Sequence, residues 1–362
     1  MTDAGDGLAA ILAGAVPRVC PAAVAMIAVD GDVAATAAAG ELVRYADAGG
    51  ALAAARPPAR HDSIFDLASV SKLFTTVVLL SLAEEGRLSL DEPAAARLPG
   101  LDPRITPRRL LTHTAGLPPT RRIDRELPAA SAAERMAAMP ATPVAHPVGG
   151  PYLYSDVGMI LAGRLAEVAG GAPLDVLVRD RVTAVLGLPD TGYRPPGRPR
   201  PDLERVAATE YKAGRGCVRG EVHDETAHAL GGVAGHAGVF ATAADLLAFG
   251  EALRRGGGPV LRQESVAEMT RDQGVTGAAF RHGLGVRLGD PAVAGLLAGA
   301  YGHSGFTGTS LVVDPARRLT VVLLTNAVHP VRGRGGIREL RQAVAAEALR
   351  LAGTGRRSPS RP

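Results

Sequence analysis

A serine and a lysine three residues apart are the first pair in this chain whose side chains could do chemistry together. Ser69 and Lys72 lie in the segment FDLASVSK, at the start of a long apolar stretch. On a helix, residues three apart share one face, so the Ser69 hydroxyl and the Lys72 ammonium can meet. A helix N-terminus also stabilises the negative charge of an alkoxide. The pair predicts a nucleophile and its partner, although a serine cap followed by a solvated lysine is the alternative reading.

The use of lysine in this chain is itself informative. Lys72 and Lys212 are the two lysines, and every other strongly basic side chain is arginine. Arginine cannot give up its proton in a protein, whereas lysine can when its pKa falls well below its usual value of about 10.4. We expect burial against the neighbouring apolar residues to lower the pKa of Lys72 in this way. Lys72 is therefore predicted to handle the proton of Ser69.

Two further segments carry reactive side chains. Tyr154 and Asp156 form a Tyr-x-Asp pattern at the start of a predicted helix, and a phenol beside a lysine can relay a proton. The sequence His303-Ser304-Gly305-Phe306 lies before a predicted strand. Its small residues let a backbone edge approach a substrate carbonyl, although a glycine-rich turn with a surface histidine is the alternative.

In this order and at these separations, the three segments resemble the signature elements of serine β-lactamases, DD-peptidases and related esterases. Residues 105–118 and 232–245 resemble two more conserved stretches of that superfamily, so the resemblance runs over residues 24–351. It implies an acyl-enzyme on Ser69 and a proton relay through Tyr154. It also implies an oxyanion hole made by the backbone N–H groups of Ser69 and Phe306. Asp156 departs from the asparagine of class C members and adds a carboxylate near the site.

The third element differs from that of antibiotic-hydrolysing members, which commonly have Lys-Thr-Gly. His303-Ser304-Gly305 resembles the esterase-like and peptidase-like branches instead. An unperturbed histidine titrates near 6.5, so at pH 7 His303 would offer a β-lactam carboxylate only a partial charge. We therefore expect a poor β-lactamase and a measurable esterase, unless an arginine elsewhere in the cleft supplies the charge. The residues predicted to contact substrate here are Asp156, His303, Ser304, Gly305 and Phe306.

Residues 220–228 combine histidines and carboxylates, which raises the question of a metal site. Their spacing fits no standard zinc pattern, and we expect no metal and no cofactor. The segment resembles a loop of peptidase-like members, so we expect it to line the rim of the cleft and contact substrate. His223 and, from the glycine-rich segment, His236 are predicted to bind substrate, whereas His113 and His146 are predicted to be structural.

The pattern of elements predicts an α/β (α+β) fold, with an antiparallel sheet flanked by helices and an inserted, mainly helical domain. A helix over residues 6–16 leads into a hairpin over 24–38, and a helix over 69–85 follows. Short helices broken by prolines are expected over 106–112, 130–138, 156–168 and 174–186, and a further helix over 242–253. Strands return at 309–313 and 320–325 before a closing helix over 337–351. The predicted domains are 1–88 with 232–352, an insertion over 89–231, and a disordered tail over 353–362.

Composition limits the partners of this chain. With 46% hydrophobic and 21% charged residues among 362, it falls in the class of globular proteins. The net charge of +4 comes from dispersed arginines, and aromatic residues make up 3%, so a nucleic-acid platform is not expected. No apolar run reaches the ~18 residues of a membrane span, and the acidic start lacks an export signal. We expect a cytoplasmic protein in which Cys20 and Cys217 are structural or incidental.

Three functions remain open at this stage. The first is hydrolysis of a small-molecule ester or amide through an acyl-Ser69 intermediate. The second is acyl transfer from the same intermediate to an alcohol or amine, and the third is a binding protein built on a retired hydrolase fold. Because all three signature elements keep their reactive atoms, the enzyme hypotheses rank above the binding protein. Substrate identity and oligomeric state stay open.

Overall fold

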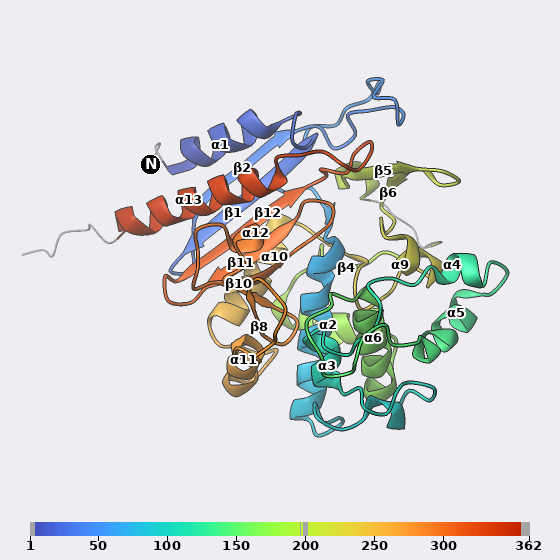
Figure 1. Ribbon diagram of the computed structural model, residues 1–362. Helices are drawn as coiled ribbons and strands as arrows, with labels where there is room; N and C mark the ends of the chain where they lie inside the picture. Colours follow the sequence, from blue (N-terminus) through green and yellow to red (C-terminus); the bar gives the residue numbers. More distant parts are fainter. Residues whose placement is uncertain (1–3, 196, 198–201, 356–362) are drawn as a thin grey trace, which may run out of the picture.

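A computed structural model describes residues 4–195, 197 and 202–355 and contains a seven-stranded antiparallel sheet with helices on both faces (Figure 1). The strand order is β2-β1-β12-β11-β10-β9-β8. This confirms the predicted fold class. The strands are β1 (Ala22–Val29), β2 (Asp32–Gly40), β8 (Arg281–His282), β9 (Arg287–Leu288), β10 (Tyr301–Ser304), β11 (Ser310–Asp314) and β12 (Leu319–Thr325).

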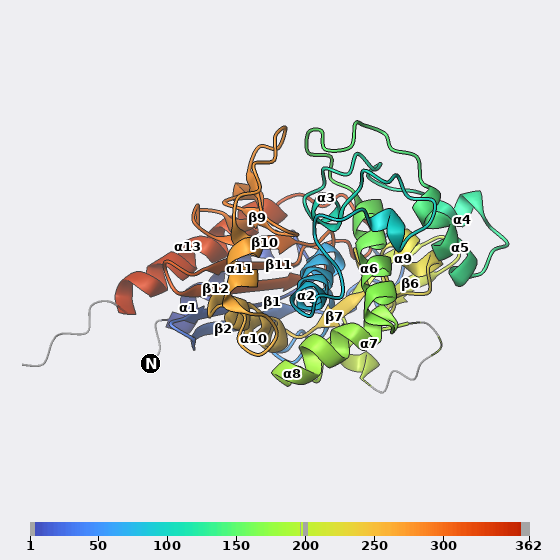
Figure 2. The same cartoon turned by 90° about the horizontal axis from the view of Figure 1, so that it is seen from below.

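The central strands are apolar on both faces because each face is covered by helices. α1 (Ala4–Ala15) and α13 (Ile337–Gly355) lie along one face, and α2 (Ser71–Glu84) and α10 (Ala243–Arg254) lie on the other (Figures 1 and 2). Alternate residues of β1 accordingly enter two separate cores, with Ile27 packing under α1 and α13 and Val24 packing on the α2 side. The sheet is thus the middle layer of the molecule.

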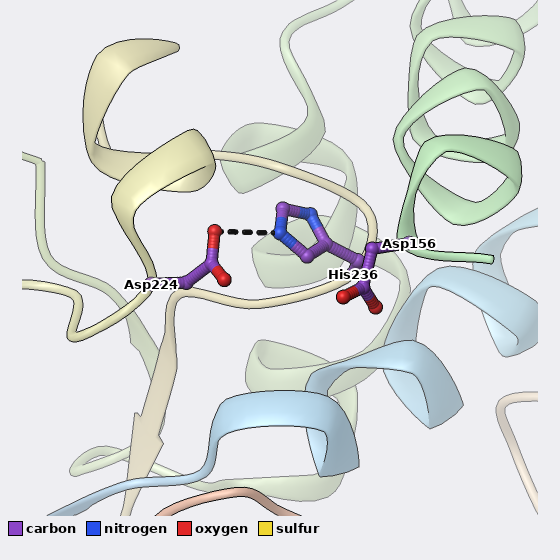
Figure 3. A group of neighbouring side chains, drawn as sticks. All are labelled: Asp156, Asp224 and His236. Atoms are coloured by element: carbon purple, nitrogen blue, oxygen red, sulfur yellow. Dashed lines mark hydrogen bonds and ion pairs between the residues drawn. The ribbon is translucent and has the colours of Figure 1, made fainter. Parts of the chain in front are cut away.

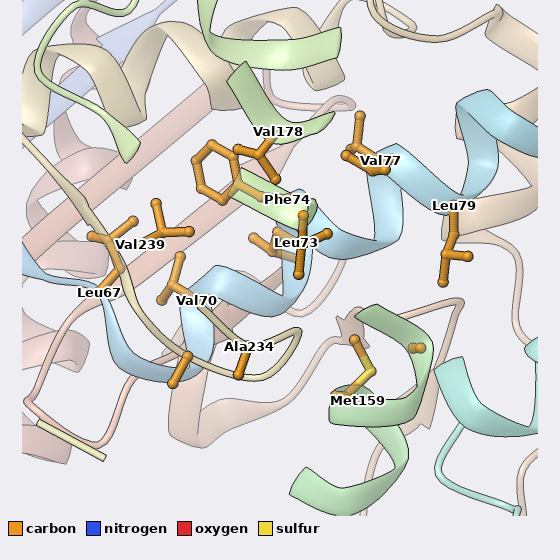
Figure 4. Close-up of a cluster of buried hydrophobic side chains, with 14 of the residues drawn as sticks. Leu67, Val70, Leu73, Phe74, Val77, Leu79, Met159, Val178, Ala234 and Val239 are labelled. Carbon is orange, nitrogen blue, oxygen red and sulfur yellow. The ribbon is translucent and has the colours of Figure 1, made fainter. Parts of the chain in front are cut away.

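Helix α2 joins the sheet to the helical region. All its residues from Ser71 to Leu82 are buried. The ring of Phe74 stacks on that of Phe249 from α10, with centroids 4.3 Å apart. Figure 4 shows the opposite side of α2 against Met159 of α6 (Asp156–Gly170) and the glycine-rich segment that carries Ala234. An apolar helix enclosed on all sides gives the residues at its N-terminus a fixed position.

Two helices of the helical region begin at side-chain caps, close to where the sequence predicted them. Thr106 caps α3 (Pro107–Leu111), and Ser155 caps α6 by accepting a hydrogen bond from the Gly158 N–H. The other helices here are α4 (Ile123–Glu126), α5 (Ala132–Ala138), α7 (Leu174–Val178), α8 (Ala184–Leu186) and α9 (Glu225–Ala229). The predicted helix over 174–186 is interrupted by a π-helical turn, Arg179–Thr183, and the region also contains a hairpin of β5 (Ala208–Lys212) and β6 (Gly216–Arg219).

Several details differ from the prediction. His303 and Ser304 precede β11, as predicted, but they also lie inside the short strand β10, which pairs with β11 and β9 and which the sequence did not reveal. Helix α13 runs to Gly355, so residues 353–355 are helical, and the rest of the predicted tail lies outside the described residues. The domain boundaries stay a prediction.

Smaller elements complete the fold. A three-stranded sheet joins β3 (Phe65–Asp66), β7 (Val239–Ala241) and β4 (Gly192–Tyr193), and α11 (Gln263–Thr270) and α12 (Pro291–Ala294) precede the last strands. Within the described part of the chain, no single helix combines the length and apolarity of a membrane span; α6 and the helical stretch Leu174–Leu186 meet those values only together, bent by 78°. Cys20 and Cys217 are both free thiols.

Candidate active site

Ser69 lies in a tight turn between β3 and α2. The turn Ala68–Val70 is a short 3₁₀ helix, and α2 itself begins at Ser71, two residues later than predicted. Ala68 has a φ of +47°, in the left-handed region that non-glycine residues rarely adopt. This turn directs Ser69 into a cleft and brings Lys72 beneath it, where Lys72 Nζ donates a hydrogen bond to Ser69 Oγ at 2.8 Å.

Tyr154 approaches the same oxygen from the segment that precedes α6. Its hydroxyl donates to Ser69 Oγ at 3.0 Å, and Lys72 Nζ lies 5.0 Å from the centroid of its ring. The ring also contacts the imidazole of His113, with centroids 4.7 Å apart. Two segments far apart in sequence therefore bring a serine hydroxyl, a lysine ammonium and a phenol into contact.

Lys72 is fully buried, and its ammonium contacts three oxygen atoms. Besides Ser69 Oγ, these are the backbone carbonyl of His236 at 3.1 Å and Oδ1 of Asp156, which forms an ion pair at 2.8 Å. Burial acts to lower the pKa of Lys72, but the negative charge of Asp156 and then Tyr154 raise it, and the pKa ends above its usual value. The expectation of a lowered lysine pKa is therefore wrong, because sequence alone did not show that Asp156 would reach the ammonium.

Asp156, Asp224 and His236 lie close together (Figure 3), and Asp156 and the His236 carbonyl contact Lys72. Asp224 caps α9 by accepting from the Ala227 N–H, and its Oδ1 also accepts from His236 Nε2 at 2.8 Å. Burial raises the pKa of Asp224, but the nearby His236 outweighs it and holds that pKa well below its usual range. The pair fixes the glycine-rich segment, so that the His236 carbonyl meets Lys72.

Among the described residues, these three side chains form the group whose ligand atoms, all within 4.8 Å of one another, could hold a metal ion. However, the Lys72 ammonium already places a positive charge 2.8 Å from Asp156 Oδ1. A divalent cation there would face that ammonium directly, and like charges at this distance repel strongly. We assign no metal to this cluster.

A cleft of about 370 Å³ opens over Ser69. Its lining includes Tyr154, Asp156, His223, Asp224, Ser304 and Phe306. Gly305 packs so closely under the cleft that a Cβ on it would lie 2.4 Å from the carbonyl oxygen of Leu67. Among the described residues, the N–H groups of Ser69 and Phe306 have no hydrogen-bond partner, which suits the oxyanion hole that the family resemblance implied.

The segment 220–228 forms part of the cleft wall through His223, Asp224 and Glu225. The imidazole of His223 stacks on the exposed ring of Phe306, with centroids 5.6 Å apart, and its Nε2 lies 2.8 Å from Oε2 of Glu210. His236 also lines the cleft. These positions let the segment touch a substrate in the cleft.

His303 occupies a different place from the one predicted. It is 1% exposed and lies behind Tyr154, with ring centroids 6.3 Å apart, where its Nδ1 donates to the Ser304 carbonyl. Burial, helped by the positive charges of Arg287 and Lys72, holds the pKa of His303 well below its usual value. The expected partial charge at pH 7 is wrong, and His303 supports Tyr154 as a neutral ring.

Arg287 is one of the cleft residues, with Thr120 and Arg332, that the sequence did not reveal. It lies on β9, paired in register with Gly302 of β10, and lines the cleft with its guanidinium 5.4 Å from the centroid of the Tyr154 ring. Nη1 donates to Asp290 Oδ2 at 3.0 Å, whereas Nε has no hydrogen-bond partner among the described residues. The sequence allowed for an arginine here but offered no signal to choose one, because β9 is two residues long.

Comparisons with known proteins found a family match and similar relatives. A family model described as Beta-lactamase matches residues 11–346. A putative D-alanyl-D-alanine carboxypeptidase of Escherichia coli (strain K12) is 31% identical over 307 residues, which cover 74% of this chain and 70% of that protein.

Solved structures share the fold at lower identity. A mutant of simvastatin synthase from Aspergillus terreus has a TM-score of 0.74 and 23% identity, covering 98% of this chain and 96% of its own. EstCE1, described as a hydrolase with promiscuous acyltransferase activity, has a TM-score of 0.71 and 23% identity, covering 94% of this chain and 98% of its own.

Proposed function

The chain belongs to the beta-lactamase family, and on that premise we propose that it hydrolyses a small ester or amide through an acyl-Ser69 intermediate. The observation that carries this proposal is the position of Ser69 Oγ, which lies 2.8 Å from Lys72 Nζ and 3.0 Å from the Tyr154 hydroxyl at the floor of a cleft. A serine held between two proton-carrying groups suits nucleophilic catalysis.

The raised pKa of Lys72 assigns the two partners different roles. Lys72 enters the reaction as an ammonium, which has no lone pair to accept a proton. We therefore propose that Tyr154 first releases its phenolic proton to water in the cleft, and that the resulting phenolate oxygen takes the proton of Ser69 as Ser69 Oγ bonds to the substrate carbonyl carbon. The ammonium stabilises the negative charge on both oxygens. Tyr154 then returns the proton to the leaving group, and water releases the acyl group from Ser69 by the reverse sequence.

Arg287 supports a narrower substrate class. Arg287 lines the cleft beside Tyr154, and a guanidinium in this position is suited to hold a carboxylate by charge-assisted hydrogen bonds. We propose that the substrate carries a carboxylate near the scissile bond, as in a carboxypeptidase reaction. A neutral His303 offers no charge to the carboxylate of a β-lactam, but Arg287 can offer a fixed positive charge instead. We therefore no longer expect β-lactam hydrolysis to be weak.

Covalent labelling of Ser69 tests the reaction itself. A fluorophosphonate should add to the intact wild-type protein at one site, Ser69, as seen by mass spectrometry, and p-nitrophenyl acetate should be turned over. Ser69→Ala should lose labelling and lower turnover by ~10⁴ or more. An unlabelled wild type, or a Ser69→Ala variant above a tenth of wild-type turnover, would exclude the acyl-Ser69 mechanism.

Substrate pairs that differ in one charge test the role of Arg287. We expect a peptide ending in D-alanyl-D-alanine to be cleaved faster than the same peptide with an amidated C-terminus. Arg287→Ala should lower kcat/KM for the acid by about 10- to 100-fold, the cost of a charged hydrogen bond, and for the amide by less than about 3-fold. Arg281→Ala, on the exposed end of β8, is the matched control. Equal losses on both peptides would contradict carboxylate recognition.

The same assay tests whether water or an alcohol accepts the acyl group from Ser69. Addition of an alcohol to the reaction with p-nitrophenyl acetate separates hydrolysis from acyl transfer by the products formed. Acetate as the main product supports the hydrolase proposal, whereas the acetylated alcohol as the main product would make the chain an acyltransferase that uses the same Ser69 intermediate.

A further inference from the structure

Asp66 is a buried carboxylate just before the nucleophile that the reaction steps above do not use. It is 2% exposed and lies on β3, three residues before Ser69. Among the described residues no lysine or arginine forms an ion pair with it, and both of its oxygens accept backbone N–H groups instead. A buried carboxylate without a cation is costly to desolvate, so its two acceptor roles need an explanation.

The first oxygen of Asp66 holds the nucleophile turn. Oδ1 accepts the N–H of Ala68 at 2.8 Å, a bond that spans two residues. Aspartate bonds of this local kind stabilise turns that the backbone would not otherwise favour. Ala68 is the residue with a φ of +47°, and its conformation sets the direction of the next peptide group, which carries the Ser69 N–H. Asp66 thus orients one predicted oxyanion donor.

The second oxygen and the carbonyl of Asp66 reach the two other walls of the cleft. Oδ2 accepts the N–H of His223 at 2.7 Å, and the His223 ring stacks on Phe306. The backbone carbonyl accepts from Thr307 Oγ1 at 2.8 Å, directly after Phe306. One residue therefore ties the nucleophile turn, the 220–228 segment and the chain that carries the Phe306 N–H.

We propose that Asp66 is a positioning residue of the oxyanion hole, which holds the N–H groups of Ser69 and Phe306 at the spacing that a tetrahedral oxyanion requires. This inference rests on the proposed acyl-Ser69 reaction. Donors aimed at the oxyanion stabilise the transition state more than the bound substrate. Disturbing Asp66 consequently lowers kcat and leaves KM nearly unchanged.

The substitution Asp66→Asn is the sharpest test. It keeps one oxygen of the side chain as an acceptor and replaces the other by an NH₂ group, which cannot accept a hydrogen bond from a backbone N–H. We expect kcat for p-nitrophenyl acetate to fall by about 10- to 100-fold, within the range for a weakened oxyanion donor, with KM changed less than 3-fold. The affinity for phenylboronic acid, whose serine adduct places an oxygen in the hole, should fall by the same factor as kcat.

Two further variants separate positioning from folding. Thr307→Val removes only the bond to the Asp66 carbonyl and should lower kcat and boronate affinity together, even if Asp66→Asn does not fold. Asp245→Asn is the matched control, because Asp245 also accepts a backbone N–H, from Asp190, and the Thr191 hydroxyl away from the cleft. It should lower thermal stability and leave kcat and boronate affinity within 2-fold.

The outcomes distinguish this inference from the proposed function. If wild type is not labelled at Ser69, the acyl-Ser69 reaction fails and the inference with it. If wild type reacts normally and the folded Asp66→Asn and Thr307→Val proteins keep wild-type kcat and boronate affinity, Asp66 is only structural. A loss confined to KM would also overturn the positioning role.

Discussion

At the scale of single residues, the charge of Lys72 depends on Asp156. The carboxylate lies 2.8 Å from Nζ in a site that excludes water from the ammonium, so their attraction is strong. A protonated lysine at this position stabilises negative charge on the oxygen atoms of Ser69 and Tyr154.

Asp156→Asn should move the alkaline limb of the activity profile. The carboxylate raises the pKa of Lys72, so its removal lowers that pKa, and the ammonium is lost at a lower pH. If activity requires the ammonium, kcat/KM for p-nitrophenyl acetate will decline at a lower pH in the variant than in wild type. Profiles measured between pH 6 and 11 check this, and an alkaline limb that stays in place or moves upward would show that Lys72 acts without its charge.

Lys72→Arg should be nearly as damaging as Lys72→Met. The ammonium contacts three acceptors at 2.8 to 3.1 Å in a fully buried site, and the larger planar guanidinium cannot match that geometry. We expect both variants to lose roughly 10³-fold or more in acylation rate, measured by stopped flow with p-nitrophenyl acetate. An arginine variant that keeps over a tenth of the rate would reduce Lys72 to a simple positive charge.

At the scale of elements, the glycine-rich segment 232–238 is pressed between α2 and α6. Thr75 Oγ1 of α2 donates to the Gly235 carbonyl at 2.8 Å, next to the His236 carbonyl that Lys72 uses. On the other side, a Cβ on Gly235 would lie 2.0 Å from the Met159 carbonyl oxygen of α6. The helix pair and the segment therefore set the position of Lys72 jointly.

Gly235→Ala tests this packing. Its methyl group has no room, so the segment must move away from α6, which should lower the free energy of unfolding by about 1–3 kcal/mol, as overpacking does. Urea denaturation measures the loss, and kcat should fall with it because Lys72 loses its carbonyl contact. Gly14→Ala in α1, where a Cβ meets nothing within 4 Å, is the control and should be neutral or stabilising. Equal stability of both variants would contradict the tight contact.

At the scale of the whole molecule, the interior holds several histidines as neutral rings. Burial lowers the pKa of His282 and His329 to about 4, and it holds those of His113 and His303 well below the usual value. His329 shows why: its Nε2 accepts the N–H groups of Arg44 and Tyr45, and its Nδ1 donates to the Thr209 carbonyl. A proton on Nε2 would break two of these bonds.

The protein should therefore lose stability in mild acid. The unfolded chain binds protons on these histidines near pH 6.5 and the folded chain does not, so the free energy of unfolding falls as pH drops below that value. Between pH 7.5 and 5.5 we expect a loss of roughly 1 kcal/mol per buried histidine. Urea denaturation at the two pH values checks this, and equal stability at both would show that these rings charge freely in the folded state.

The sequence by itself determined the parts of this protein that local patterns encode. Apolar periodicity and caps predicted the hairpin, α2, α6, α10 and the last strands, because those signals act within a few residues. Helical spacing predicted the contact between Ser69 and Lys72, and the family resemblance added Tyr154. The resemblance to a family of serine hydrolases was likewise visible in short segments and is confirmed by the match over residues 11–346.

Only the tertiary structure decided the charge and the walls of the cleft. The pKa of Lys72 is raised because Asp156 lies close to the ammonium, and His303 is neutral because it is buried behind Tyr154. The place of Arg287 depends on the register between β9 and β10. Ionisation and sheet register are set by neighbours remote in sequence, through desolvation and Coulomb interaction and through hydrogen bonding between strands, and no local pattern reports them.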